Sequence, residues 1–213
     1  MAVEGVVLVL LGAESTGKSW LADALCRDLV AEGHDAVRVA EYLREFSDHH
    51  GRTPRAHEQA AIAREQTQRI ALAAREHAIV VADTSALMTA IYSACLFDDP
   101  SLLAPAIATQ RSYAASLLTA LDLPWVADGH QRDGPAERQA IDSCLRATML
   151  DAGLAFSVIH GRDDRRLAAA RAAIKTVLHP ASVDRDTPSW RWRCATCDGD
   201  PCLRLPEMSD SGV

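Results

Sequence analysis

Residues 6–20 read VVLVLLGAESTGKSW. An apolar run is followed by Gly12, four further residues and Gly17-Lys18-Ser19, which matches the phosphate-binding pattern G-x-x-x-x-G-K-[ST]. The apolar run predicts a buried strand, and the residues from Lys18 onward have helical spacing, so the pattern stands in the strand–loop–helix setting that it requires. This stretch therefore predicts a P-loop, the loop that binds nucleotide phosphates.

Each part of this loop has a physical task in binding ATP and Mg²⁺. The two glycines allow backbone angles and close approaches that a Cβ atom would prevent. The loop N–H groups and the N-terminus of the following helix form a cradle for anions. We expect Lys18 to reach the β- and γ-phosphates, and the Ser19 hydroxyl to ligate Mg²⁺. The expected nucleotide-binding residues are Gly12, Ala13, Glu14, Ser15, Thr16, Gly17, Lys18, Ser19 and Trp20.

The composition fits one α/β domain, or one domain with a small appendage. The chain has 213 residues, of which 48% are hydrophobic and 24% are charged. Its net charge is −7 and no large basic patch is visible, which argues against nucleic acid or a membrane surface as a partner. No segment is long enough to cross a bilayer, and the N-terminal apolar run lacks the basic flank of a signal peptide. We therefore expect a cytoplasmic protein.

Five short apolar runs alternate with helical patterns along the chain. The expected strands cover residues 6–11, 36–40, 79–82, 123–127 and 155–159. The expected helices cover residues 18–31, 56–77, 86–97, 102–120, 136–151 and 163–178. Polar loops are expected at residues 47–55 and 128–135. This alternation predicts a doubly wound parallel five-stranded sheet with helices on both faces, because crossovers between parallel strands are right-handed.

Ligands of such a sheet bind where its strands end, at their C-terminal edge. Asp83 follows the third expected strand, where a carboxylate would hold Mg²⁺ or position the attacking hydroxyl. Its alternative role is to cap the helix that follows. Glu41 and Arg44 follow the second strand and could bind a substrate hydroxyl and an anionic group. Their alternative role is an ion pair on a solvated helix turn.

Two further candidates belong to the fourth expected strand and to the loop after it. Arg132 lies where a mobile lid of a phosphoryl-transfer enzyme would carry an arginine over the transferring phosphate. A solvated turn is the alternative, because Asp-Gly and Asp-Gly-Pro both occur in this loop. Trp125 would be either a core residue or a stacking face for a flat ring.

The segment from residue 180 onward differs in composition and carries Cys194, Cys197 and Cys202. In a cytosolic chain such a cluster suggests metal binding more than disulfides. The spacing Cys194-x-x-Cys197 fits a zinc knuckle. The fourth ligand is missing from the local pattern, and His179 is a candidate by residue type only. A reduced, unligated tail and a redox-labile pair are the alternatives. We therefore expect a nucleotide-binding domain at 1–179 and a Cys-rich tail at 180–213.

With these residues in hand, the chain resembles the ribosylnicotinamide kinase domain of NadR-type proteins of NAD biosynthesis. The resemblance rests on GAESTGKS, EYLRE after the second strand, IVVADT at the third, and PWVADGHQRD before the expected lid. It covers roughly residues 5–178. It implies a nucleotide-kinase-like P-loop fold that transfers the ATP γ-phosphate to the ribose 5′-hydroxyl of nicotinamide riboside.

The resemblance also implies roles for single residues. Lys18 and Ser19 would serve ATP and Mg²⁺, Asp83 would be the Walker-B carboxylate, and Arg132 would lie in the lid. The residues that it places beside the substrate or its base are Glu41, Tyr42, Arg44 and Trp125.

Two features depart from the family pattern. The family's second acid, two residues after the Walker-B carboxylate, is Ser85 here, and His130-Gln131 stands between the glycine and the arginine of the lid. The leading hypothesis is a small-molecule kinase with a nucleoside-like acceptor. The alternatives are a nucleotide-binding regulatory or partner-binding module, with the tail as an interaction element, and another nucleoside or nucleotide kinase.

Overall fold

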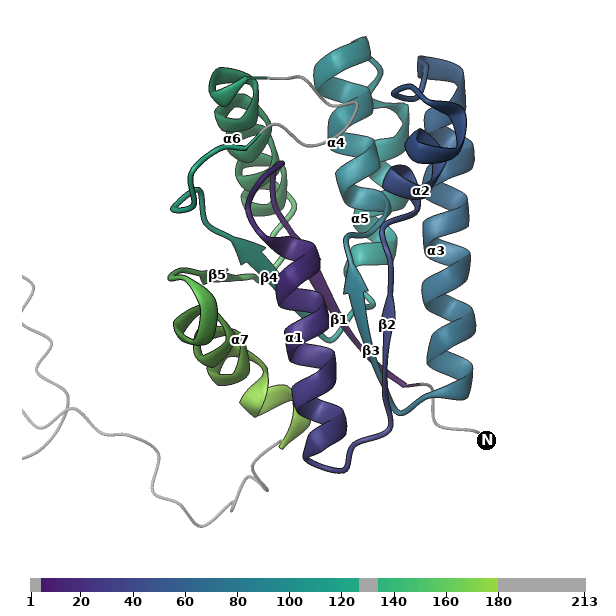
Figure 1. Cartoon of the computed structure of the whole chain (residues 1–213). Helices are drawn as coiled ribbons and strands as arrows, with labels where there is room; N and C mark the ends of the chain where they lie inside the picture. The colour runs from purple at the N-terminus through teal and green to yellow at the C-terminus, as the bar shows by residue number, and fades with distance from the viewer. Residues whose placement is uncertain (1–4, 127–133, 180–213) are drawn as a thin grey trace, which may run out of the picture. The chain divides into compact units, whose positions relative to one another are not determined.

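A five-stranded parallel sheet forms the centre of the protein. The structure is a computed structural model that describes residues 5–126 and 134–179. Its strands are β1 (Val6–Leu11), β2 (Ala36–Val39), β3 (Ile79–Asp83), β4 (Ala115–Thr119) and β5 (Ser157–Ile159). Every neighbouring pair is parallel and the strand order is β2-β3-β1-β4-β5 (Figure 1). The predicted doubly wound parallel sheet is confirmed.

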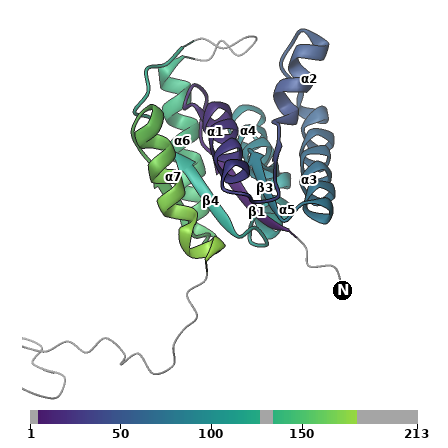
Figure 2. The same cartoon turned by 60° about the horizontal axis from the view of Figure 1, so that its bottom comes forward.

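Different helices cover the two faces of this sheet (Figures 1 and 2). The helices are α1 (Lys18–Ala31), α2 (Tyr42–His50), α3 (Gln59–Glu76), α4 (Ala86–Phe97), α5 (Leu103–Gln110), α6 (Pro135–Asp151) and α7 (Asp163–Leu178). Helices α1 and α7 pack on one face, and α3, α4 and α6 pack on the other. Helix α2 contacts α3, and α5 contacts α4. No helix in the described ranges is both long and apolar enough to cross a membrane.

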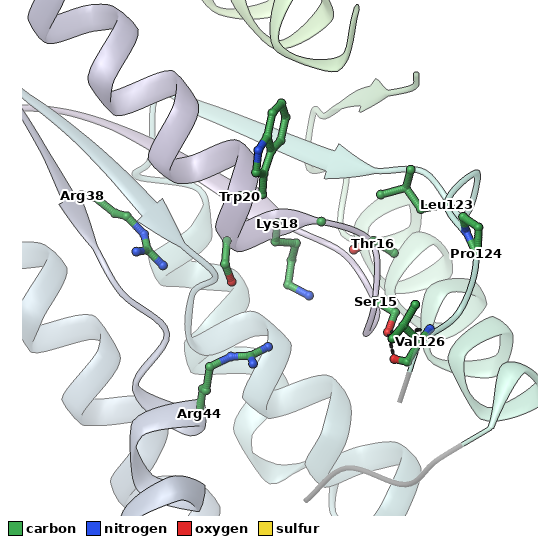
Figure 3. A pocket seen from close by; sticks show the side chains of 11 residues that line it. Ser15, Thr16, Lys18, Trp20, Arg38, Arg44, Leu123, Pro124 and Val126 are labelled. Atoms are coloured by element: carbon green, nitrogen blue, oxygen red, sulfur yellow. Dashed lines mark hydrogen bonds between the residues drawn. The ribbon is translucent and has the colours of Figure 1, made fainter. Parts of the chain in front are cut away.

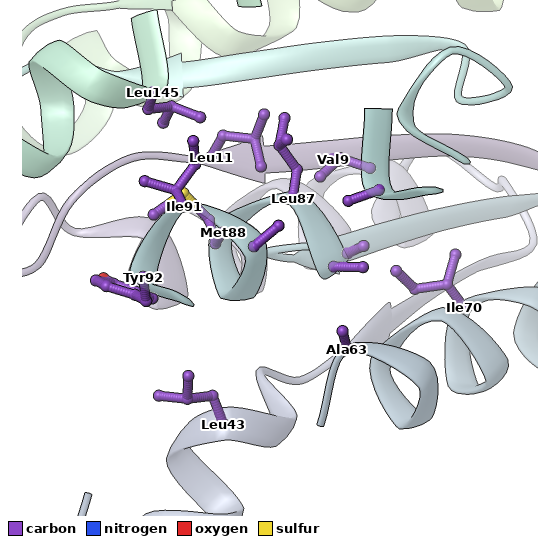
Figure 4. Packing of buried hydrophobic residues seen from close by; sticks show 14 of the residues in the cluster. Val9, Leu11, Leu43, Ala63, Ile70, Leu87, Met88, Ile91, Tyr92 and Leu145 are labelled. Carbon is purple, nitrogen blue, oxygen red and sulfur yellow. The ribbon is translucent and has the colours of Figure 1, made fainter. Parts of the chain in front are cut away.

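The side chains of β1 divide between two hydrophobic clusters because successive residues of a strand point to opposite faces. Leu8 and Leu10 pack with residues of α1 and α7. Val9 and Leu11 pack on the other face (Figure 4). Their partners there come from α3, α4 and α6 and include Ile70, Leu87, Ile91 and Leu145. Burial on both faces explains why β1 reads as an unbroken apolar run.

The expectations for residues 102–127 are wrong. The helix expected at 102–120 ends at Gln110, and Ala115–Thr119 forms strand β4 instead. The strand expected at 123–127 is therefore displaced, and residues 120–126 form a loop that follows β4. Strand β4 has the sequence ASLLT and lies buried between β1 and β5. A short strand that is buried on both faces has no polar alternation, so periodicity cannot separate it from a helix.

The other expected elements are confirmed to within a few residues, with one addition. Helix α2 occupies part of the loop expected at 47–55 and ends at Gly51, whose φ of 64° is left-handed. The helix expected at 56–77 begins as a 3₁₀ turn, η1 (Ala56–Glu58), before α3. A second 3₁₀ turn, η2 (Pro100–Leu102), precedes α5. The predicted boundary at 179/180 coincides with the end of the described residues, and the Cys-rich tail lies outside them.

Candidate functional site

The loop between β1 and α1 has its shape fixed by two glycines and by a hydroxyl from β4. Gly12 has φ 143° and Gly17 has φ 75°, both in the range that favours glycine. A Cβ atom at Gly12 would lie only 2.2 Å from Oγ1 of Thr119. That hydroxyl oxygen is 3.0 Å from the carbonyl oxygen of Leu11 and 2.7 Å from Oγ1 of Thr16. The last residue of β4 therefore holds both ends of the loop.

Gly12→Ala should lower nucleotide affinity by at least about tenfold and the unfolding free energy by more than about 2 kcal/mol. The new methyl group must displace Thr119, and the alanine backbone must also adopt the positive φ of residue 12. The matched control is Gly153→Ala, because Gly153 also has positive φ, 62°, and a Cβ there meets nothing within 4 Å. Urea unfolding and calorimetric titration with a nucleotide measure both effects. Equal losses for the two variants would contradict the proposed role of Gly12.

Lys18 is largely buried at the start of α1 and points into the centre of the loop (Figure 3). Its Nζ donates a hydrogen bond of 2.8 Å to the carbonyl oxygen of Ala13. The hydroxyl of Thr16 donates to the same carbonyl oxygen, also at 2.8 Å. The ammonium group is thus held over the concave side of the loop, where phosphate oxygens can take the place of the carbonyl oxygen.

A pocket of about 600 Å³ opens above the loop, a volume suited to a nucleotide-sized ligand. Three side chains on different elements bring positive charge to it, Lys18 from α1, Arg38 from β2 and Arg44 from α2 (Figure 3). The lining residues are Ser15, Thr16, Gly17, Lys18, Ser19, Trp20, Arg38, Arg44, Leu123, Pro124 and Val126. Six of the nine residues predicted to bind nucleotide are among them.

The loop after β4 forms the apolar wall of this pocket through Leu123, Pro124 and Val126. Ser15 ties this wall to the P-loop, because its hydroxyl donates to the carbonyl oxygen of Val126 and accepts from the N–H of the same residue at 3.3 Å. Trp125 lies in this loop rather than in a strand and is half-buried. It is not among the described residues that line the pocket.

Asp83 lies at the end of β3 and is almost fully buried, with 1% of its surface exposed. Its Oδ2 accepts a 2.8 Å hydrogen bond from Nη2 of Arg38, and its Oδ1 has no hydrogen-bond partner within the described ranges. An unpaired buried carboxylate oxygen is costly unless a cation or water completes it. This orphaned oxygen fits the expected role of Asp83 toward Mg²⁺. The alternative role as a helix cap belongs to Ser85, whose hydroxyl accepts from the N–H of Leu87.

Ser85, which stands where the resembled family has a second acid, belongs to a buried polar network. Its hydroxyl donates to Oε1 of Gln110 at 2.6 Å, and Nε2 of Gln110 donates to the hydroxyl of Ser116 at 2.9 Å. All three residues are buried. The network joins α4, α5 and β4 without a carboxylate, so this position offers no acid to a substrate.

The residues predicted beside the substrate separate in the structure. Arg44 lines the pocket, and Oε2 of Glu41 lies 3.9 Å from its Nε, with 12% of the Glu41 side chain exposed. The ring of Tyr42 instead packs against α3, with its centroid 4.4 Å from Cζ of Arg69. The structure therefore places Arg44 at the pocket with Glu41 beside it, although Glu41 is not among the described residues that line the pocket, and it turns Tyr42 toward α3.

Two arginines that support the site were not expected from the sequence. Arg38 joins Asp83 to Asp23 of α1, donating to Oδ1 of Asp23 at 2.9 Å. Arg166 of α7 is 1% exposed and donates to the carbonyl oxygen of Thr16 in the P-loop at 2.8 Å. The available signals were an arginine inside the apolar run AVRVA and an arginine on the buried face of the last helix.

Several predicted residues lie outside the described ranges. Arg132 and the other residues of 127–133 are among them, as are Cys194, Cys197 and Cys202. Within residues 5–126 and 134–179, no group of three His, Cys, Asp or Glu side chains could hold a metal ion. His179, the candidate fourth ligand, is exposed at the end of α7.

The sheet, the P-loop and its pocket define a P-loop kinase-like domain. Residues 7–166 match the family model described as an AAA domain, and the chain belongs to this family. No curated protein matches the chain.

Three solved structures are similar to the chain in fold. NadR in complex with NR has a TM-score of 0.61 and 21% identity over 80% of this chain and 50% of NadR. NadR in complex with NAD and AMP-PNP has a TM-score of 0.62 and 19% identity over 81% of this chain and 49% of NadR. Thymidylate kinase from Ehrlichia chaffeensis has a TM-score of 0.57 and 14% identity over 82% of this chain and 100% of the kinase chain. The chain thus spans about half the length of the NadR chains, and the predicted P-loop kinase-like fold is confirmed.

Proposed function

We propose that this protein is an ATP-dependent kinase that phosphorylates a hydroxyl of a small nucleoside-like acceptor, with nicotinamide riboside as the first candidate. One observation carries the proposal. Lys18 and two arginines from separate elements converge on a pocket above a P-loop (Figure 3). One of these arginines, Arg38, binds the buried carboxylate of Asp83, whose other oxygen has no partner within the described ranges. The resemblance to ribosylnicotinamide kinases and the fold shared with an NR-bound NadR support the choice of acceptor.

The donor side works by positioning and by charge. The loop N–H groups would hold the phosphates of ATP, and Nζ of Lys18 would leave the Ala13 carbonyl oxygen for the β- and γ-phosphate oxygens. Ser19 and Oδ1 of Asp83 are the groups that would hold Mg²⁺, which when bound neutralises phosphate charge. The apolar wall after β4 keeps water from one side of the pocket, which strengthens these electrostatic contacts.

The acceptor side depends on Glu41 and Arg44. Arg44 reaches the pocket from α2, and the largely buried Glu41 carboxylate lies next to it. Glu41 would accept the proton of the attacking hydroxyl, and Arg44 would orient the acceptor. We assign the base to Glu41 rather than Asp83, because Arg38 already occupies one oxygen of Asp83. Arg132, if it closes over the phosphate as the resemblance implies, would add charge from the lid.

Glu41→Gln should lower kcat by about 10²-fold or more and change the KM for ATP little, because the proton acceptor is lost while the donor contacts remain. Glu45→Gln is the matched control in the first turn of α2, just after Glu41, since Glu45 is exposed and pairs with Arg69. Steady-state kinetics with saturating acceptor give both parameters. A loss no larger than that of the control would exclude Glu41 as the base.

The proposed activity is tested by incubating the full chain with ATP and Mg²⁺ and a panel of acceptors. The panel contains nicotinamide riboside, thymidine, thymidine monophosphate and other nucleosides, and products are identified by mass. We expect phosphorylated nicotinamide riboside and ADP in equal amounts. Phosphorylation of another panel member instead would support the kinase activity but show that nicotinamide riboside is not its acceptor. ATP hydrolysis that no acceptor changes would instead support a regulatory nucleotide-binding module.

We also propose, on spacing alone, that Cys194, Cys197 and Cys202 hold a structural Zn²⁺ in the tail. Protein purified without chelators should then carry close to one zinc per chain by elemental analysis. Serine in place of all three cysteines should remove it. Zinc far below one equivalent in the unaltered protein would reject the site.

A further inference from the structure

Arg38 occupies an unusual position for a charged residue. It lies inside β2, in register with Val81 of the neighbouring strand β3, and its side chain is 27% exposed. Its guanidinium group reaches across the C-terminal edge of the sheet into the pocket above the P-loop (Figure 3). A side chain at this place can contact β3 and α1 at the same time.

The guanidinium group is fixed from two sides. Nη2 donates to Oδ2 of Asp83 at 2.8 Å, and Nη1 donates to Oδ1 of Asp23 at 2.9 Å. The two acceptors differ in burial, because the side chain of Asp83 is 1% exposed and that of Asp23 is 53% exposed. Asp23 on α1 thus anchors the arginine from the solvent side, and the arginine in turn holds the buried carboxylate. The rigid fork of an arginine suits this bridge better than the point charge of a lysine.

This bridge determines which oxygen of Asp83 is free. With Oδ2 bound to Arg38, the carboxylate cannot rotate without breaking that bond, and Oδ1 is left with no partner within the described ranges. A ligand of a metal ion, or of metal-bound water, must offer a lone pair in one fixed direction, and neighbouring hydrogen bonds commonly provide that orientation.

We infer that Arg38, anchored by Asp23, is a positioning residue that orients Asp83 so that Oδ1 faces the Mg²⁺ of a bound nucleotide. The inference rests on the proposed nucleotide-binding function but not on the identity of the acceptor. Arg38 acts through Asp83 and not through a contact with the phosphates.

The test measures the affinity of the full chain for AMP-PNP by calorimetry, once with Mg²⁺ and once with EDTA. The ratio of the two dissociation constants is the gain in affinity that the metal provides. We expect a gain of at least about tenfold for the unaltered chain, and a gain near one for Asp83→Asn. Arg38→Lys should reduce the gain by at least about threefold while the dissociation constant in EDTA changes less than about twofold. This variant keeps a positive charge beside Asp83, so the chain should still fold.

Asp23→Asn provides a second route to the same result. Asp23 is exposed and binds Arg38, so loss of its charge should loosen the arginine and reduce the gain from Mg²⁺ in the same direction. Arg75→Lys, on an exposed arginine of α3, is the matched control and should leave the gain unchanged. In the double variant Arg38→Lys/Asp83→Asn, the gain should equal that of Asp83→Asn alone.

The outcomes separate this inference from the proposed function. If Arg38→Lys bound AMP-PNP about tenfold more weakly in EDTA, Arg38 would contact the nucleotide directly, which would overturn the inference. An unaltered gain in both Arg38→Lys and Asp23→Asn would also overturn it. Absence of AMP-PNP binding by the unaltered chain would overturn the proposed function itself, and the inference with it.

Discussion

Lys18→Ala is expected to lower kcat for phosphoryl transfer by at least about 10³-fold, with the fold retained. Among the described residues that line the pocket, Lys18 carries the only ammonium group, and its Nζ donates to the Ala13 carbonyl oxygen. Charge on the β- and γ-phosphate oxygens changes as the γ-phosphoryl group moves. A preorganised cation at this point therefore stabilises the transition state more than the bound nucleotide.

The chain supplies its own control for this experiment, because it contains only two lysines, Lys18 and Lys175. Lys175 is exposed near the end of α7, so Lys175→Ala removes the same charge from a site remote from the P-loop. Product formation with the accepted nucleoside gives kcat, and circular dichroism checks the fold of both variants. A Lys18→Ala protein with a tenth or more of the original kcat would show that this P-loop does not serve phosphoryl transfer.

The part of the site made by consecutive residues was predictable from the sequence. The P-loop carries its own geometry, because each glycine, the lysine and the serine have separate physical tasks within eight residues. Asp83 followed from topology, since a parallel sheet brings the ends of its strands to one edge. The structure places Asp83 at the end of β3, in register with Leu10 of the neighbouring strand β1.

The misplaced fourth strand shows what periodicity could not supply. The sequence ASLLT continues the apolar spacing of the helix before it, and only its burial between β1 and β5 makes it a strand. Two parts of the site were hidden by this error. One is the Thr119 hydroxyl that braces Gly12, and the other is the loop with Leu123 that forms the apolar wall. The Thr119 hydroxyl bonds to Thr16, 103 positions earlier in the chain. The loop with Leu123 is tied to the P-loop through Val126 and Ser15, which are 111 positions apart.

Arg38 and Arg166 could not be assigned from the sequence for a different reason. A charged residue is stable inside a protein only when distant groups complete its hydrogen bonds, and the sequence does not say which groups those are. Arg38 donates its hydrogen bonds to residues of α1 and β3. Arg166 donates to the P-loop and to the loop after β4. Such residues become interpretable only when the fold shows their partners.

Arg166→Leu is expected to lower the unfolding free energy by about 3 kcal/mol or more, because each buried acceptor that loses its donor costs about 1–3 kcal/mol. The guanidinium group donates to Oδ1 of Asp122 and to the carbonyl oxygens of Gly161, Thr16 and Ala120, at 2.8, 2.6, 2.8 and 3.2 Å. Leucine fills part of the space but satisfies none of these acceptors. Because one of them belongs to the P-loop, nucleotide affinity should fall as well.

The adjacent residue gives the matched control for this prediction. Arg165 is exposed on the same turn of α7, and Arg165→Leu should change stability by no more than about 0.5 kcal/mol. Urea unfolding measures both variants, and isothermal titration with AMP-PNP measures the P-loop. Similar unfolding midpoints for the two variants would show that the buried arginine does not brace the loop.

The pH dependence of the stability loss in Arg166→Leu provides a further check on the cause of that loss. Burial raises the pKa of Asp122, but the hydrogen bonds from Arg166 and from the Gly161 N–H outweigh it, so the net pKa is lowered. A carboxyl group with a lowered pKa stabilises the folded state above its unfolded pKa of about 4, and this contribution is lost as pH falls through the folded pKa. The stability difference between the unaltered chain and Arg166→Leu should therefore be largest above about pH 4 and should narrow in more acidic solution. A difference that stays constant into acid would assign the loss to the carbonyl contacts of Arg166 rather than to its pair with Asp122.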